Sequence, residues 1–74
     1  MNHPAPAFNT VELDGHPHTV PAGTTLADLL ALHGTPPDAV ATAVNQRFVP
    51  RTARAGTVLA AGDRVTTFEA ITGG

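Results

Sequence analysis

Four histidines and six carboxylates are the side chains in this 74-residue sequence with the potential to catalyse a reaction or bind a metal. His16 and His18 are spaced to share one face of a strand, but a zinc site needs further ligands and no obvious cluster of carboxylates accompanies them. Asp14, Asp28 and Asp63 fall at predicted turns or at a helix start, where short acceptors stabilise the local backbone. The pattern therefore predicts surface histidines, and neither a metal site nor a catalytic carboxylate pair.

Other common kinds of active site are also missing from the sequence. Cysteine is absent, which excludes disulfides, thiolate zinc sites and cysteine catalysis. Neither of the glycine-rich phosphate-binding patterns, GxGxxG and GxxxxGK[ST], occurs. A chain of this length also encloses little volume for a pocket. We therefore predict that the protein is not an enzyme by itself and that it binds no cofactor or metal.

The charge balance argues against nucleic acid as a partner. The formal net charge is −2, with four arginines and no lysine, whereas nucleic-acid binding needs a basic stripe. Three phenylalanines, with no Trp or Tyr, also offer little for bases to stack on. No stretch approaches the length of a membrane span, and the first residues lack the basic and apolar regions of a signal peptide. We predict a cytoplasmic protein that binds neither nucleic acid nor membrane.

The C-terminal residues 70–74 (AITGG) end in two glycines and an α-carboxylate. Five extended residues reach about 16 Å, and Gly73 and Gly74 lack side chains that would limit entry into another protein's active site. A carboxylate is a poor acyl donor until an oxygen is exchanged for a leaving group such as AMP, after which the carbonyl can accept sulfur, a thiol or an amine. The Gly74 carboxylate is therefore the predicted reactive group. The alternative is an ordinary frayed chain end.

A hairpin is predicted to begin the folded part of the chain. Val11 and Leu13 alternate with polar residues, which is typical of a half-buried strand. Asp14 and Gly15 then form a two-residue turn signal, because both tolerate positive φ. A second strand over residues 16–20 contains a proline, which places it at the edge of a sheet.

One helix is predicted after the hairpin. Thr25 is the expected N-cap, with Asp28 three residues later completing a capping box. Gly34 supplies the C-cap, and the prolines that follow prevent continuation. His33 lies near the C-terminal end, where a cation or a capping donor is favourable. Four residues recur at helical spacing and predict the buried face: Leu26, Leu29, Leu30 and His33.

Three further strands are predicted, over residues 39–44, residues 47–49 and the stretch that follows a turn at residues 62–63. The intervening residues 51–61 are predicted to be irregular, with Val58 and Leu59 entering the core. Because one helix covers only one face of a sheet, the order β-β-α-β-β-β predicts a two-layer α+β domain.

The last predicted strand places an aromatic side chain beside the tail. If its alternate residues Val65 and Thr67 face the helix, Phe68 faces the opposite side of the sheet. An exposed Phe68 is a natural docking anchor for a partner, and Ile71 and Thr72 in the tail are further predicted contacts. The alternative is a β-bulge or bend that returns Phe68 to the core.

Residues 9–74 resemble the ubiquitin-like sulfur carriers of the ThiS family of thiamin biosynthesis. The most specific matches are residues 44–51 (VNQRFVPR, the family's VN-x-x-x-VPR segment), 62–65 (GDRV) and 73–74 (GG). The hairpin turn and residues 24–30 also match. Many family members carry a tryptophan soon after VPR, where this chain has residues 52–54 (TAR), and the seven-residue N-terminal extension is longer than is typical.

The resemblance implies a ubiquitin-like β-grasp, with one helix packed on a mixed sheet of four to five strands. The expected division is a flexible extension over residues 1–7, the domain over 8–69 and a flexible tail over 70–74. The resemblance also implies that an E1-like adenylyltransferase of the ThiF or MoeB type, using ATP and Mg, activates Gly74. A cysteine desulfurase system then supplies sulfur, and the thiocarboxylate delivers it to a thiazole synthase of the ThiG type.

Three alternatives use the same fold. One is the small subunit of molybdopterin synthase, although that family often has prolines before Gly-Gly and residues 70–72 (AIT) have none. Another is a ubiquitin-like modifier or tRNA-thiolation carrier, whose activated C-terminus forms isopeptide bonds. The last is a β-grasp interaction module with an idle tail, because the fold alone does not specify a function.

Overall fold

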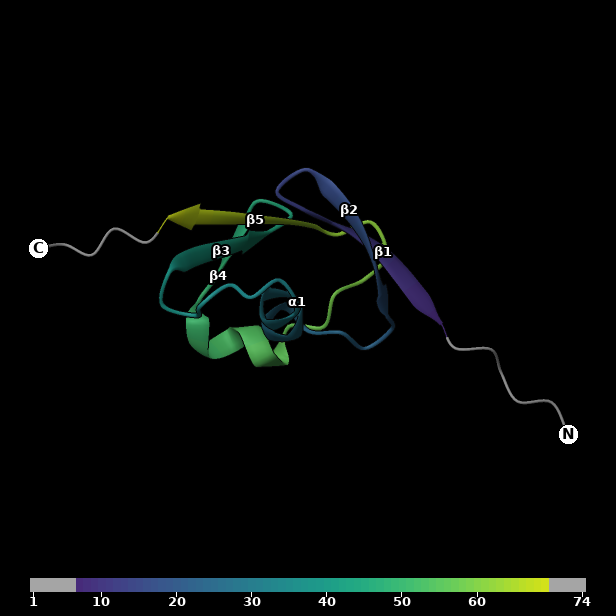
Figure 1. Cartoon of the computed structure of the whole chain (residues 1–74), viewed down its shortest axis with the longest axis horizontal. Helices are drawn as coiled ribbons and strands as arrows, with labels where there is room; N and C mark the ends of the chain where they lie inside the picture. The colour runs from purple at the N-terminus through teal and green to yellow at the C-terminus, as the bar shows by residue number, and fades with distance from the viewer. Residues whose placement is uncertain (1–6, 70–74) are drawn as a thin grey trace, which may run out of the picture.

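The computed structural model describes residues 7–69, so the predicted extension and tail lie outside the described residues, apart from residue 7 (Figure 1). The predicted order of strands and helix is confirmed. One segment differs, because a 3-10 helix forms within residues 51–61, where irregular structure was predicted. The elements are β1 (Phe8–Leu13), β2 (His16–Pro21), α1 (Leu26–Leu32), β3 (Val40–Val44), β4 (Arg47–Val49), the 3-10 helix η1 (Arg51–Gly56) and β5 (Arg64–Glu69).

The five strands form one mixed sheet in the order β2-β1-β5-β3-β4. The last strand, β5, lies in the middle, parallel to β1 and antiparallel to β3. Figure 1 shows α1 and η1 on the same side of this sheet, and within residues 7–69 no helix covers the other side, called here the outer face. The two-layer α+β architecture predicted from the sequence is therefore confirmed.

The β1–β2 hairpin forms as its turn residues predict. Asp14 and Gly15 have φ values of 50° and 85°, the left-handed region that a two-residue hairpin turn of this type requires. Pro17 pairs with Glu12 in β1, and its missing N–H is tolerated because β2 is an edge strand.

Reciprocal side-chain bonds start the helix. The Asp28 N–H donates to the Thr25 hydroxyl at 3.1 Å, and the Thr25 N–H donates to the Asp28 carboxylate at 3.0 Å. This capping box satisfies two N–H groups that have no partner within the helix. The buried residues of α1 are the three leucines predicted for that face.

The helix ends in a Schellman motif, and here one prediction was wrong. Gly34 adopts φ 66°, its N–H donates to Ala31 O, and the Thr35 N–H donates to Leu30 O. His33 is the C-cap residue and is exposed, so it does not extend the buried stripe. The physical reason is that the helix stops at residue 32, before the stripe completes its second turn.

The core lies between α1 and the inner face of the sheet. Val58 was predicted to enter it with Leu59, but Val58 is 61% exposed while Leu59 is 1% exposed. Val58 forms a bridge with Thr25, and successive residues of an extended segment point to opposite sides. The buried cluster consists of Val11, Leu13, Val20, Leu26, Leu29, Leu30, Leu59 and Val65.

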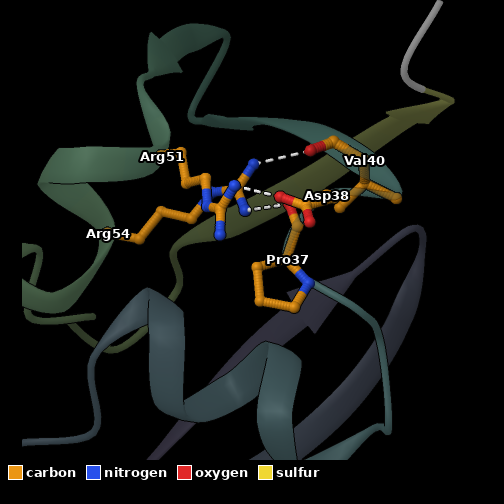
Figure 2. A network of polar contacts seen from close by, with 5 residues as sticks. All are labelled: Pro37, Asp38, Val40, Arg51 and Arg54. Atoms are coloured by element: carbon orange, nitrogen blue, oxygen red, sulfur yellow. Dashed lines mark hydrogen bonds and ion pairs between the residues drawn. The ribbon is translucent and has the colours of Figure 1, made fainter. Parts of the chain in front are cut away.

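A buried arginine joins η1 to the segment before β3. Arg54 is 4% exposed, and its guanidinium donates to Pro37 O at 3.0 Å, Val40 O at 2.6 Å and Thr42 Oγ1 at 3.1 Å. Figure 2 shows this side chain reaching from η1 toward Pro37 and Val40. Three neutral acceptors in different directions suit the planar fork of a guanidinium. No pattern in the sequence singles out this residue.

A second arginine beside Arg54 makes a surface ion pair. Arg51 contacts Asp38, with 62% and 77% of the two side chains exposed (Figure 2). Exposed pairs of this kind contribute about 0–1 kcal/mol, so Arg54 is the stronger tie between η1 and β3.

Candidate functional site

The strand that leads to the C-terminal glycines is held from both sides. β5 pairs with β3 from Val65 to Glu69, whereas its pairing with β1 covers only Arg64 and Val65. Glu69 is the last described residue. Outside the described residues lie the predicted partner contacts, Ile71 and Thr72, and the predicted reactive end, Gly73 and Gly74. The structure therefore shows how β5, which is the base of the tail, is held in the sheet.

Beyond the end of β1, the side chain of Asp14 continues the hydrogen bonding to β5. The Thr67 N–H donates to Asp14 Oδ1 at 2.7 Å, and the Thr67 hydroxyl donates to Asp14 Oδ2 at 2.6 Å. The Asp14 N–H also donates to Val65 O at 2.9 Å, which continues the parallel ladder by one step. Charge-assisted bonds of this length are about twice as strong as neutral ones. The hairpin turn thus holds β5 two residues before its end.

The β3–β4 turn is tied to the start of the same strand. Asn45 and Gln46 have φ values of 52° and 69°, which asparagine tolerates better than most residues. The Asn45 side chain accepts from the Arg64 N–H at 2.9 Å and donates to Asp63 Oδ1 at 2.9 Å. In addition, the Asn45 N–H donates to Arg64 O at 2.8 Å. Polar side chains from two neighbouring turns therefore hold β5 at Arg64 and at Thr67.

The outer face next to β5 carries two exposed aromatic side chains. Phe68 is 55% exposed and lies opposite Ala41, while Phe48 is 70% exposed and lies opposite Ala43. Ala43 also lies opposite Thr66, and residues paired in this way point to the same face. We call these five residues the outer-face patch. It lies at the end of the sheet from which the tail leaves.

The predicted position of Phe68, exposed on the face of the sheet opposite the helix, is confirmed. Val65, on the inner face of the same strand, is 1% exposed, whereas Phe68 is 55% exposed and no bend returns it to the core. Its role as a docking anchor stays a prediction. Phe48 was not singled out from the sequence, because only the register of β3 against both β4 and β5 brings it beside Thr66 and Phe68.

The described part of the chain contains no group of three or more His, Cys, Asp or Glu residues able to hold a metal. Asp28 and Asp63 accept hydrogen bonds from nearby backbone N–H groups, as the sequence predicted, whereas the Asp14 carboxylate accepts from Thr67 in the distant strand β5. Within residues 7–69, no helix is long and apolar enough to cross a membrane. The absence of metal and cofactor binding stays a prediction.

Comparison with known proteins identifies the family. The model of the ThiS family matches residues 8–74. This chain belongs to the ThiS family. A similar solved structure is the thiamine biosynthesis protein ThiS from Geobacter metallireducens, with a TM-score of 0.70 and 26% sequence identity; the match covers 88% of this chain and 99% of that one. No curated protein matches the chain.

Membership of the ThiS family confirms the resemblance inferred from the sequence motifs. The mixed five-stranded sheet with one helix matches the ubiquitin-like β-grasp of the ThiS structure. At the level of the family, the match supports a sulfur carrier in thiamin biosynthesis. The ThiS-like segment of residues 44–51 forms the end of β3, the turn, β4 and the start of η1, so its asparagine acts in the contact with β5 described above.

Proposed function

We propose that this protein is a sulfur carrier whose C-terminal Gly74 is adenylated and converted to a thiocarboxylate that donates sulfur for thiazole formation in thiamin biosynthesis. The observation that carries the proposal is the ThiS family match, which extends through residue 74 and so includes both terminal glycines. The fixed base of the tail supports it, because β5 presents the chain at one end of the sheet beside the outer-face patch.

The chemistry of the proposal follows from the terminal carboxylate. A carboxylate oxygen attacks the α-phosphate of Mg-bound ATP in the partner, and pyrophosphate leaves. The terminal sulfur of a persulfide then attacks the acyl carbon, and AMP leaves with its bonding electrons. A thiol finally cleaves the acyl disulfide by exchange, which leaves the thiocarboxylate on Gly74 and a protein disulfide. Gly73 gives the acyl group access, because its lack of a side chain narrows the tail.

The partners of this cycle are part of the proposal. They are an E1-like adenylyltransferase that supplies ATP and Mg, a cysteine desulfurase system that supplies sulfur, and a thiazole synthase that accepts it. The protein is then a co-substrate of these enzymes and not an enzyme, and it acts in the cytoplasm. Ile71 and Thr72 are expected to contact the adenylyltransferase as the tail enters its site.

The proposal is tested by the intact mass of the protein. Purification from its host should yield a fraction that is heavier by about 16 Da, because sulfur replaces one oxygen of the terminal carboxylate. Incubation with the adenylyltransferase, ATP and a sulfur source should increase this fraction. Complete absence of the heavier species under both conditions rejects a carrier role. Conjugates to lysines of other proteins, found under denaturing conditions, would instead support the modifier alternative.

Phe68→Ala is expected to weaken docking without unfolding the domain. An aromatic anchor in a protein interface contributes about 1–2 kcal/mol or more, so the KM for the carrier in adenylation should rise about tenfold or more. The melting temperature should change little, because the side chain is 55% exposed. The measurement is pyrophosphate release at varied carrier concentration, beside a thermal melt.

Phe8→Ala is the matched control for that variant. Phe8 is 57% exposed and its strand parity places it on the same outer face, since Val11 and Leu13 are buried. The register of Glu12 beside Arg64 separates Phe8 and Phe68 by eight residues along the strands, about 26 Å. Phe8→Ala should leave the KM unchanged. Equal effects of the two substitutions, or a large loss of melting temperature with Phe68→Ala, would remove the docking role.

A further inference from the structure

Two histidines that are 15 positions apart meet on the helix side of the sheet edge. His18 lies in β2 and His33 is the C-cap residue of α1. Their ring centroids are 4.3 Å apart and the ring planes make an angle of 66°. The sequence had paired His18 with His16 along one strand. The fold instead brings it against a histidine from another element.

The backbone on both sides of this contact is fixed. His18 lies opposite Val11 in the β1–β2 ladder. The His33 N–H donates to Leu29 O and Leu30 O, and the left-handed Gly34 follows it in the Schellman motif. Two side chains on fixed backbone need little ordering to meet a common ligand, which lowers the entropic cost of binding.

Within the described structure, both imidazoles are accessible to solvent and have no hydrogen-bond or ion-pair partner. His18 is half-buried and His33 is exposed. In residues 7–69, neither ring takes part in a hydrogen bond or an ion pair. The nearest titratable group on β2 with the same strand parity is His16, and the only carboxylate in α1, Asp28, lies in its first turn. All four arginines follow residue 46, so none comes from β2 or α1.

In contrast to the prediction from the sequence that no metal binds, we propose that His18 and His33 together chelate one divalent transition-metal ion, with water completing the coordination. Neutral imidazole suits Ni²⁺, Cu²⁺ and Zn²⁺, with metal–nitrogen distances of about 2.0–2.1 Å. Two rings on one ion place their centroids about 4.5–5.2 Å apart for angles between 90° and tetrahedral. The observed 4.3 Å therefore requires an opening of less than about 1 Å, which rotation about the side-chain bonds provides.

A site of two protein ligands differs from a structural zinc site. It leaves several coordination positions to water, so the ion remains exchangeable and open to a ligand from another molecule. Because the ion would link β2 to α1, binding should also stabilise the folded chain relative to the unfolded chain. Binding requires both rings to be neutral, so it should weaken in acid.

The test is calorimetric titration of the full chain with ZnCl₂. We expect saturable binding of one ion, and a loss of affinity of about tenfold or more for His18→Ala and for His33→Ala. His16→Ala is the matched control, because it removes a histidine from the same strand that does not contact His33. His3→Ala is a second control for the histidine in the first six residues. Both control variants should bind within about twofold of the parent chain.

A second readout locates the ion. Addition of ZnCl₂ should shift the imidazole NMR signals of His18 and His33 and leave those of His16 unchanged, and it should raise the melting temperature of the parent chain but not of His33→Ala. Retention of full affinity by His33→Ala, loss of binding in His16→Ala, or no saturable binding up to about 1 mM would each overturn the proposal.

Discussion

Removal of Gly74 is expected to abolish sulfur transfer while the folded domain stays intact. The deletion moves the terminal carboxylate by one residue, about 3.3 Å, within the active site of the activating enzyme. Misplacement of a reacting group by about 1 Å already costs roughly a hundredfold in rate, so adenylation should fall below detection. The domain should be unaffected, because its core and the polar ties of β5 all lie within residues 7–69.

Three measurements on this variant separate the chemistry from the fold. The mass gain of about 16 Da should disappear, ATP–pyrophosphate exchange by the activating enzyme should be lost, and the thermal melt should match that of the parent chain. Gly74→Ala keeps the length of the tail and is the control for its width, since it adds one methyl group at the reacting residue. If a strain that carries only the Gly74 deletion variant still grew where growth requires its own thiamin synthesis, the assignment to thiazole formation would be rejected.

Arg54→Met should produce the largest loss of stability among substitutions of the charged residues. Methionine fills a similar volume but leaves Pro37 O, Val40 O and Thr42 Oγ1 without their donor. Each buried group that loses a partner costs about 1–3 kcal/mol, so we expect a loss of about 3 kcal/mol or more in the free energy of unfolding. For comparison, a domain of this size has a total free energy of unfolding of about 4–11 kcal/mol. Denaturant melts should show the change in midpoint.

Arg54→Lys and Arg51→Met test the reason for that loss. A lysine ammonium keeps the charge but cannot offer three donors in a planar fork, so Arg54→Lys should lose stability as well. Arg51→Met removes only the exposed pair with Asp38 and should cost no more than about 1 kcal/mol. Arg54→Met with the stability of the parent chain would show that the three bonds make no net contribution.

Local signals in the sequence predicted much of this fold. The Asp14 and Gly15 turn and the Thr25 capping box depend on backbone conformations that a few neighbouring residues determine, and both appear in the structure. The β-grasp fold with its mixed sheet followed from the family resemblance, whereas the order of the strands within the sheet was not predicted. The parallel contact between β1 and β5 joins chain segments about fifty residues apart, and no local pattern encodes it.

The residues that the sequence did not single out concern contacts between distant segments. Arg54 resembles a surface residue in the sequence, and only the approach of η1 to Pro37 and Val40 buries it. The two histidines of the proposed metal site likewise meet only when β2 packs beside the end of α1. The candidate docking surface shows the same limit. Phe68 followed from strand alternation, whereas Phe48 required the register of three strands.

The central place of β5 has a consequence for the synthesis of the carrier. β5 is the last strand before the terminal glycines, yet it separates β1 from β3 in the sheet. In a nascent or truncated chain that lacks this strand, β1 and β3 each gain an unpaired edge, and no sheet joins the hairpin to β3. The outer-face patch also loses Phe68 and Thr66 in such a chain. Under the proposed function, the surface that partners would recognise is therefore completed only a few residues before the chain reaches its proposed reactive end.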